Sequence, residues 1–295
     1  MKILVIGGTR FFGKRLVDIL IEEGCDVTLL TRGETPDPFG GTVRRLRAHR
    51  SSTQEMISAV SGADFDVIYD QICFSPDDAQ LACSIFSGRV GRYIFTSSMY
   101  VYSSGSGLVE GNYDPSAHPL RMGNRDALSY EDGKRYAEGV FLRDQRMPVV
   151  CVRFPIVMGY DDYTGRFTFH VGRVLTGTPI LIPVPRGYMN YISADMAARF
   201  LCWVKGINHR GPINAACPEA LTAEDIVTLM GGILGRIPCI IQEEPSGKTP
   251  LSPYHRSEDM VMNTDLATRL GFTFPSLSTW FAGEVARASV RLEAA

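Results

Sequence analysis

A tyrosine and a lysine four residues apart carry chemistry that this 295-residue chain could use. They are Tyr130 and Lys134, within "LSYEDGKRYAE". If this stretch is helical, the two side chains lie on one face, one turn apart. A phenol has an ordinary pKa of about 10, which must fall by about 3 units for proton exchange near neutrality. A neighbouring ammonium favours the phenolate, so the pair predicts a proton-transferring tyrosine.

A serine hydroxyl completes the candidate catalytic set. Ser98 ends the apolar run "RYIFTSS", in a stretch that precedes the tyrosine by about thirty residues. At the carboxyl end of a strand, its hydroxyl could hydrogen-bond the same substrate oxygen as Tyr130. A Tyr-x-x-x-Lys spacing alone often occurs by chance, but here it follows a serine-rich strand end and a glycine-rich opening loop. We therefore predict Ser98, Tyr130 and Lys134 as the catalytic residues.

The opening "MKILVIGGTRFFG" runs from an apolar strand through closely spaced glycines into a helix. Backbone N–H groups at such a turn, together with the helix dipole, favour a bound pyrophosphate. Gly7 allows the tight turn, and Gly13 lets the helix pack closely on the sheet. Arg10 stands where a third spaced glycine would be expected. The loop predicts a dinucleotide site with an unusual cation inside it.

The end of the second predicted strand bears on which dinucleotide binds. NAD-binding versions place an acid there, about 20 residues on, to hydrogen-bond the ribose 2′-hydroxyl. This chain has Thr31 and Arg32 instead. A guanidinium pairs with a 2′-phosphate, and Arg10, Lys14 and Arg15 add further charge. These residues favour NADP(H); the alternative is that Arg32 stacks on the adenine and NAD binds.

Strands and helices alternate through the first half of the chain. Continuous apolar runs predict buried strands, and amphipathic stretches of 3.6-residue period predict helices between them. This alternation predicts an α/β fold with a doubly wound parallel Rossmann sheet. The predicted strands cover 2–6, 26–31, 42–47, 65–72, 92–98 and 148–154, and the predicted helices cover 12–24, 53–62, 76–88 and 128–145.

The pattern loosens from about residue 159, where glycines, prolines and aromatic residues accumulate. Helices are predicted again over 191–204 and 221–235, the second with Thr222 and Asp225 at capping-box spacing. We expect a small C-terminal substrate-binding lobe beside the Rossmann domain. The expected division gives residues 1–158 and about 188–215 to the Rossmann domain, and about 159–187 and 216–295 to the lobe.

Within the predicted lobe, Arg166, His170 and Arg173 recur at helical spacing. Such a basic face could contact substrate phosphates, and we take Arg166 and Arg173 as candidate substrate residues. The same spacing also fits a solvated helix face. The two interpretations are equally supported by the sequence.

Composition excludes several classes of protein. The net charge of −2 creates no field that would attract nucleic acid or an anionic membrane. No apolar run approaches the roughly 20 residues of a membrane span, and the N-terminal stretch is too short for a signal peptide. Seven single cysteines predict free thiols and a cytoplasmic location. Five histidines without paired spacing predict no metal site.

The combination of "GGTRFFG", "FTSSMYVYS", "YEDGK" and "RFPIVMGYDD" resembles the extended short-chain dehydrogenase/reductases, also called NAD-dependent epimerase/dehydratases. The resemblance covers nearly the whole chain, down to "NTDLATRLGF". It implies Ser98 as the catalytic hydroxyl, Tyr130 as acid and base, and Lys134 as its partner on the nicotinamide ribose.

The resemblance also implies a set of cofactor contacts. Phe154 and Pro155 fall where a strand end meets the nicotinamide carboxamide, and Asp195 matches a family acid at a helix start, expected as a structural cap. The residues that fall in the pyrophosphate loop are Gly7, Thr9, Arg10, Phe11, Phe12 and Gly13.

Departures from the family pattern narrow the reaction. Dehydratases carry an Asp-Glu pair directly after the catalytic hydroxyl, whereas this chain has Met99 and Tyr100, which become candidate substrate contacts. Dehydration is therefore disfavoured. Ile156 replaces an asparagine that binds nucleotide sugars in epimerases, and His49 and Arg50 stand where members often have an aspartate that meets the adenine. The resemblance implies an epimerase or oxidoreductase that transfers a hydride at a carbinol or carbonyl carbon of a nucleotide sugar or related small molecule, with a homodimer left open.

Two alternatives come from other classes. Chloroplast stem-loop RNA-binding proteins resemble this chain in the opening loop, and "TVRRLRAHR" clusters four arginines. RNA binding would then be the primary activity, although basic runs are more often solvated faces. The second alternative is a sensor that holds NADP without turnover. An intact Ser98, Tyr130 and Lys134 set favours the enzyme over both.

Overall fold

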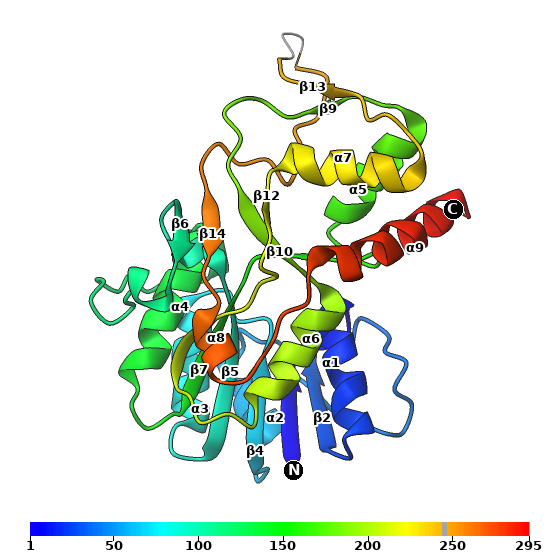
Figure 1. Cartoon of the computed structure of the whole chain (residues 1–295). Helices are drawn as coiled ribbons and strands as arrows, with labels where there is room; N and C mark the ends of the chain where they lie inside the picture. Colours follow the sequence, from blue (N-terminus) through cyan, green and yellow to red (C-terminus); the bar gives the residue numbers. More distant parts are fainter. Residues whose placement is uncertain (244–246, 295) are drawn as a thin grey trace. The chain divides into compact units, whose positions relative to one another are not determined.

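The computed structural model describes residues 1–243 and 247–294, and contacts divide them into two compact units (Figure 1). Unit 1 comprises Met1–Tyr102, Glu110–Phe154 and Asp195–Ala215. Unit 2 comprises Ser103–Val109, Pro155–Ala194 and the described residues from Ala216 onward. The chain thus changes units at 154–155 and 194–195, whereas the expected boundaries lie at 158 and about 188. Its short excursion over 103–109 has no counterpart in the expected division.

Unit 1 is built on a seven-stranded parallel sheet, which confirms the doubly wound Rossmann fold. Six of its strands were predicted, and the seventh, β11, lies at one edge. A parallel sheet needs helices on both faces, which explains the almost continuous apolar runs. In spatial order the strands are β11 (Gly211–Asn214), β7 (Val149–Phe154), β5 (Val90–Ser98), β4 (Phe65–Asp70), β1 (Lys2–Ile6), β2 (Asp26–Thr31) and β3 (Arg44–Arg47).

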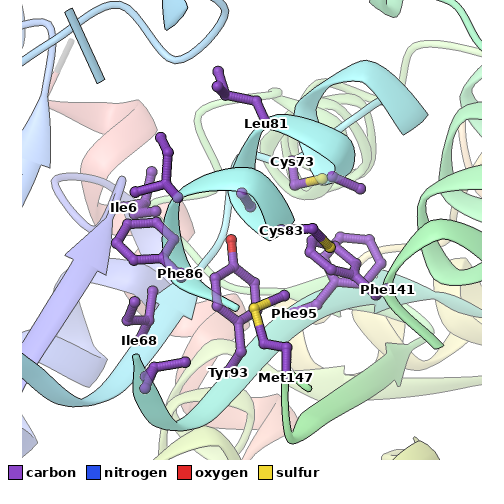
Figure 2. Close-up of a cluster of buried hydrophobic side chains, with 14 of the residues drawn as sticks. Ile6, Ile68, Cys73, Leu81, Cys83, Phe86, Tyr93, Phe95, Phe141 and Met147 are labelled. Atoms are coloured by element: carbon purple, nitrogen blue, oxygen red, sulfur yellow. The ribbon is translucent and has the colours of Figure 1, made fainter. Parts of the chain in front are cut away.

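Three helices cover one face of this sheet: α2 (Thr53–Val60), α3 (Pro76–Phe86) and α4 (Tyr130–Arg143). Figure 2 shows the buried cluster on this face, in which Phe86 and Phe141 lie near Tyr93. Helices α1 (Phe11–Glu22) and α6 (Ala194–Val204) belong to the other face. The Tyr69 hydroxyl donates to the Leu201 carbonyl of α6 over 3.2 Å, so strand and helix are joined.

Serine caps fix where the helices on the first face begin. Ser52, Ser75 and Ser129 accept hydrogen bonds from backbone N–H groups in the first turns of α2, α3 and α4. Such a cap contributes on the order of 1 kcal/mol to helix stability. The cap on α4 makes Tyr130 the first helical residue, so the predicted Tyr-x-x-x-Lys segment lies on one helical turn.

Unit 2 combines small sheets with helices α5 (Arg166–Thr176), α7 (Ala223–Leu234), α8 (Asp265–Arg269) and α9 (Phe281–Glu293). The predicted capping box on α7 is confirmed, because Thr222 and Asp225 exchange side-chain and backbone hydrogen bonds. The predicted helix over 191–204 is wrong at its start, where residues 191–193 belong to a buried strand. The strands are β6 (Gly105–Leu108), β8 (Ile156–Met158), β10 (Met189–Ser193), β12 (Ala220–Leu221) and β14 (Met260–Met262), with a separate pair β9 (Ile180–Leu181) and β13 (Ile240–Ile241).

Three properties of the described residues concern membrane-spanning helices, metal-binding clusters and cysteine pairing. Within residues 1–243 and 247–294, no helix has both the length and the apolarity needed to cross a bilayer. The same residues contain no group of three or more acidic, histidine or cysteine side chains arranged to hold a metal ion. All seven cysteines are unpaired; five are buried, and Cys25 and Cys239 are partly exposed.

Candidate functional site

The turn between β1 and α1 requires glycine, both for its backbone angles and for lack of space beside it. Gly7 and Gly8 have φ angles of +97° and +88°, in the left-handed region that favours glycine. A Cβ at Gly13 would lie 2.1 Å from the Oε1 atom of Gln71. Arg10 has a φ of −135°, an extended conformation open to any residue, so the missing glycine causes no strain. Positive φ falls instead on Phe11, at +50°.

The start of α1 suits an anion. The helix has no side-chain cap and no acidic residue in its first turn, unlike α2, α3 and α4. Below the turn, the buried Nε2 atom of Gln71 has no hydrogen-bond partner. An unbalanced helix N-terminus and an orphaned amide donor beside glycines fit the pyrophosphate of a dinucleotide. Thr9 is half-buried, and Phe12 packs on Phe154 with ring centroids 5.8 Å apart.

The adenosine end of this site carries several arginines, and most already have partners. The Arg32 guanidinium pairs with Glu34 at 2.8 Å, and Arg15 pairs with Asp195 at 2.6 Å. Asp195, expected as a structural cap at the start of a helix, therefore forms an ion pair with Arg15 of α1. Arg10 donates to the Thr35 hydroxyl over 2.9 Å. Thr31, also predicted to contact the cofactor, accepts a hydrogen bond at its hydroxyl from the Gly33 N–H over 3.1 Å.

The predicted tyrosine and lysine occupy one turn of α4 with very different exposure. Tyr130 is 46% exposed, whereas Lys134 is 1% exposed. The Lys134 Nζ atom donates to the carbonyls of Cys73 and Thr96, at 2.7 and 2.8 Å. It also lies 5.8 Å from the ring centroid of Tyr130. The pairing predicted from spacing is therefore present, with an accessible phenol over a buried amine.

Aromatic rings complete the surroundings of the amine. Lys134 Nζ lies 4.6 Å from the centre of the Phe74 ring and 4.8 Å from that of Phe95. Burial lowers the Lys134 pKa to about 8, although nearby Cys73 and Asp70 act in the opposite direction. At neutral pH the amine is still mostly protonated. A positive charge is therefore held in a largely apolar position beside the phenol.

Helix α4 reaches this position because of Gly133. A Cβ there would lie 2.3 Å from the Phe74 carbonyl oxygen, so any larger residue would push the helix away from the loop after β4. A glycine inside a helix costs about 1 kcal/mol against alanine. The close approach explains that local cost, since it places Lys134 next to Phe74 and Cys73.

Ser98 is connected to Tyr130 through Tyr100. Ser98 is 5% exposed, and its hydroxyl oxygen accepts from the Tyr100 N–H over 3.3 Å. The Tyr100 ring meets the Tyr130 ring edge-on, with centroids 6.2 Å apart. Met99, predicted with Tyr100 as a substrate contact, is completely buried and packs in the core of unit 1. Of that pair, Tyr100 alone is partly exposed.

A buried ion pair supports the elements behind this site. Arg153 of β7 and Glu138 of α4 are both fully buried and paired through two hydrogen bonds. The remaining guanidinium N–H groups donate to the Tyr102 hydroxyl and to the carbonyls of Glu110 and Tyr113. Every donor of Arg153 therefore has an acceptor. Sequence patterns predicted no role for Arg153, although a charged residue inside the apolar run "VVCVRF" indicates a buried ion pair or network.

The remaining predicted residues lie in unit 2. Pro155 begins a unit 2 segment. Arg166 donates to the Thr164 hydroxyl over 2.8 Å, and Arg173 donates to the Pro179 carbonyl over 2.6 Å. His170 is fully buried, both its ring nitrogens have partners, and burial lowers its pKa to about 4. His170 is thus a neutral core residue and does not belong to a phosphate-binding face.

No family model matches this chain. Among curated proteins, the 41 kDa chloroplast stem-loop binding protein b of Arabidopsis thaliana is 27% identical over 216 residues, covering 68% of this chain and 54% of the relative. The 2-alkyl-3-oxoalkanoate reductase of Stenotrophomonas maltophilia is 26% identical over 178 residues, covering 55% of this chain and 52% of the relative. The chain spans about half the length of these curated relatives.

Solved structures match over almost the whole chain. The dTDP-glucose 4,6-dehydratase of Bacillus anthracis, solved with NAD, has a TM-score of 0.79 at 13% identity and covers 99% of this chain and 98% of its own. The UDP-glucose 4-epimerase of Thermotoga maritima, solved with UDP-glucose, has a TM-score of 0.78 at 16% identity and covers 99% and 100%. At these identities the likeness concerns the fold, and it confirms the predicted α/β Rossmann architecture over almost the whole chain.

Proposed function

We propose that this protein is an NADP(H)-linked epimerase or reductase that acts at a carbinol or carbonyl carbon of a nucleotide sugar or related small molecule. The observation that carries the proposal is the buried Lys134 ammonium beside the accessible Tyr130 ring, within the unit that also holds the glycine turn. Fold neighbours solved with NAD and with UDP-glucose support the cofactor and substrate classes. The reductase relative supports the carbonyl chemistry.

Each residue of the site has a distinct task. A nicotinamide dinucleotide, when bound, supplies the hydride acceptor or donor. Tyr130 exchanges a proton with the substrate oxygen, because its ring is the exposed member of the set. Lys134 favours the phenolate through its charge. Ser98 has its oxygen engaged by the Tyr100 N–H, which leaves its O–H to donate to the substrate oxygen.

The test replaces one hydroxyl. Tyr130→Phe keeps the ring contacts with Phe74 and Tyr100 but removes the transferable proton. We expect turnover to fall by about 10²- to 10⁴-fold with NADP+ affinity unchanged. Tyr136→Phe, on the same helix, is the matched control and should behave as wild type. Full turnover by Tyr130→Phe would refute the assignment. The measurement is the absorbance change of added NADPH with a panel of carbonyl compounds and sugar nucleotides, which also separates an enzyme from a non-catalytic sensor.

RNA binding is the second candidate, because one curated relative is named for stem-loop binding. The predicted basic patch is smaller in the structure than in the sequence. Arg45 pairs with Asp37 at 2.6 Å, and Arg50 is buried against Asp70 at 2.7 Å. The other two of the four arginines, Arg44 and Arg47, are exposed. A gel-shift titration with a structured RNA at increasing salt tests this candidate; tight, salt-sensitive binding without any nucleotide turnover would favour it.

A further inference from the structure

A turn after β2 and the last residue of β3 meet at the adenosine end of the proposed cofactor site. Thr31 and Arg47 are register partners in the parallel pair of strands. The chain then turns at Gly33, whose φ is +78°. A Cβ at Gly33 would lie 2.8 Å from the Nε atom and 3.3 Å from the Cζ atom of Arg47. The Arg47 guanidinium is therefore seated directly against the backbone of the turn.

The charge of Arg47 is not neutralised by the protein. In the described chain, no carboxylate lies within ion-pair distance of this guanidinium and no hydrogen bond engages it. Its neighbours in sequence differ, since Arg45 pairs with Asp37 and Arg50 with Asp70. Arg32, which the sequence favoured as the phosphate ligand, pairs with Glu34. A bound anion can therefore recruit Arg47 without breaking an existing ion pair.

The glycine turn reaches the same place. Arg10 donates from its Nη2 atom to the hydroxyl of Thr35, two residues beyond Gly33. The loop that fits the pyrophosphate and the turn that seats Arg47 are thus tied together. A ribose 2′ substituent lies between the adenine and the pyrophosphate of a dinucleotide, and the acid that would hydrogen-bond a free 2′-hydroxyl is absent from positions 31 and 32.

We propose that Arg47 is the residue that selects a 2′-phosphorylated dinucleotide, with Arg32 contributing little. The inference rests on the proposed function and assigns its cofactor specificity to β3 instead of the end of β2. A guanidinium forks onto two oxygens of a phosphate, and the missing side chain at Gly33 leaves room for the Arg47 guanidinium beside the turn. Glycine at position 33 is part of the device, because a side chain there would displace the guanidinium.

The test is calorimetric titration of the whole protein with NADP+ and NAD+, and with 2′,5′-ADP and 5′-ADP as fragments. We expect wild type to prefer NADP+, and Arg47→Ala to weaken NADP+ binding by about 10- to 100-fold while NAD+ binding is retained. Arg47→Lys should lose part of the preference, because it keeps charge without the fork. Arg44→Ala, on the same strand, is the matched control, and Arg32→Ala should lower the preference less than Arg47→Ala. Melting temperatures verify that each variant is folded.

The outcomes separate this inference from the proposed function. Equal binding of NAD+ and NADP+ by wild type, or a larger loss with Arg32→Ala than with Arg47→Ala, overturns the role of Arg47 and leaves a nicotinamide-linked enzyme intact. An equal loss of affinity for NAD+ and NADP+ in Arg47→Ala also overturns it, since the residue would then not distinguish a 2′-phosphate from a 2′-hydroxyl. Failure of all four ligands to bind wild type overturns both.

Discussion

The two ends of the proposed cofactor site in unit 1 place their positive charges in opposite surroundings. At the reaction end, Lys134 is buried among aromatic rings, with carbonyl oxygens as its hydrogen-bond partners. At the adenosine end, Arg32 and Arg47 are exposed, and the first is already paired. A buried charge acts strongly on its neighbour, because water does not screen it. An exposed guanidinium acts by geometry, so we expect chemistry to depend on the first end and ligand choice on the second.

Removing the buried charge gives the largest expected effect. Lys134→Met fills a similar volume without the ammonium, so Tyr130 loses the charge that favours its phenolate. We expect turnover to fall by about 10²- to 10⁴-fold. Folding should survive, because an apolar residue of similar size often replaces a buried charge at no loss of stability. Steady-state kinetics measure turnover, and a melting curve measures folding. Full activity of the Lys134→Met protein would contradict the dependence of the chemistry on the buried charge.

A methyl group at the glycine turn has the next largest effect. In Gly13→Ala, the new Cβ would meet the Gln71 side chain, so the turn or the amide must move. Overpacking of this kind costs about 1–3 kcal/mol. We expect weaker binding of NAD+ and NADP+ alike, which distinguishes the pyrophosphate turn from the 2′ position. Gly41→Ala, where no atom lies near the added Cβ, is the control. Titration of both dinucleotides is the measurement, and unchanged affinities would contradict a pyrophosphate role.

The buried lysine also predicts how stability depends on pH. Burial lowers its pKa from 10.5 to about 8. Below that pH the amine is protonated in both folded and unfolded chains, and the folded protein bears the full cost of the buried charge. Between about pH 8 and 10.5 the folded state releases the proton and the unfolded state keeps it, so stability rises with pH. The rise amounts to about 3 kcal/mol.

Urea unfolding of wild type and Lys134→Met across that window measures this rise as a difference. Other groups titrate in both proteins and cancel. The difference in the free energy of unfolding should change steadily in favour of wild type as pH increases. A constant difference would mean that the amine is not desolvated as the structure has it.

The smallest effect is expected from Arg32→Ala. Exposed ion pairs contribute about 0–1 kcal/mol, so breaking the pair with Glu34 should barely change the melting temperature. NADP+ affinity should change by less than in Arg47→Ala. A large loss would mean that the pair opens on binding, and it would shift the selective residue back to the end of β2.

The sequence identified those features that depend on neighbours along the chain. The alternating strands and helices of unit 1, the helix that became α4 and the Tyr130–Lys134 spacing all follow from local patterns. Long-range contacts were not accessible in this way. Nothing near Arg47 in sequence shows that Gly33 seats its guanidinium, and the value of Gly133 appears only with the Phe74 carbonyl beside it. His170 is buried, so it belongs to neither of the two faces considered for its segment, because helical spacing alone does not reveal which face of a helix is buried.

The pH dependence of kcat/KM tests the central claim most directly, since it reports ionisations of the free enzyme. If the Lys134 ammonium supports proton transfer by Tyr130, the wild-type profile should fall as the pH rises through about 8. The residual activity of Lys134→Met should lack that fall. A wild-type profile that stays flat through pH 8, or a fall that persists unchanged in Lys134→Met, would contradict the account.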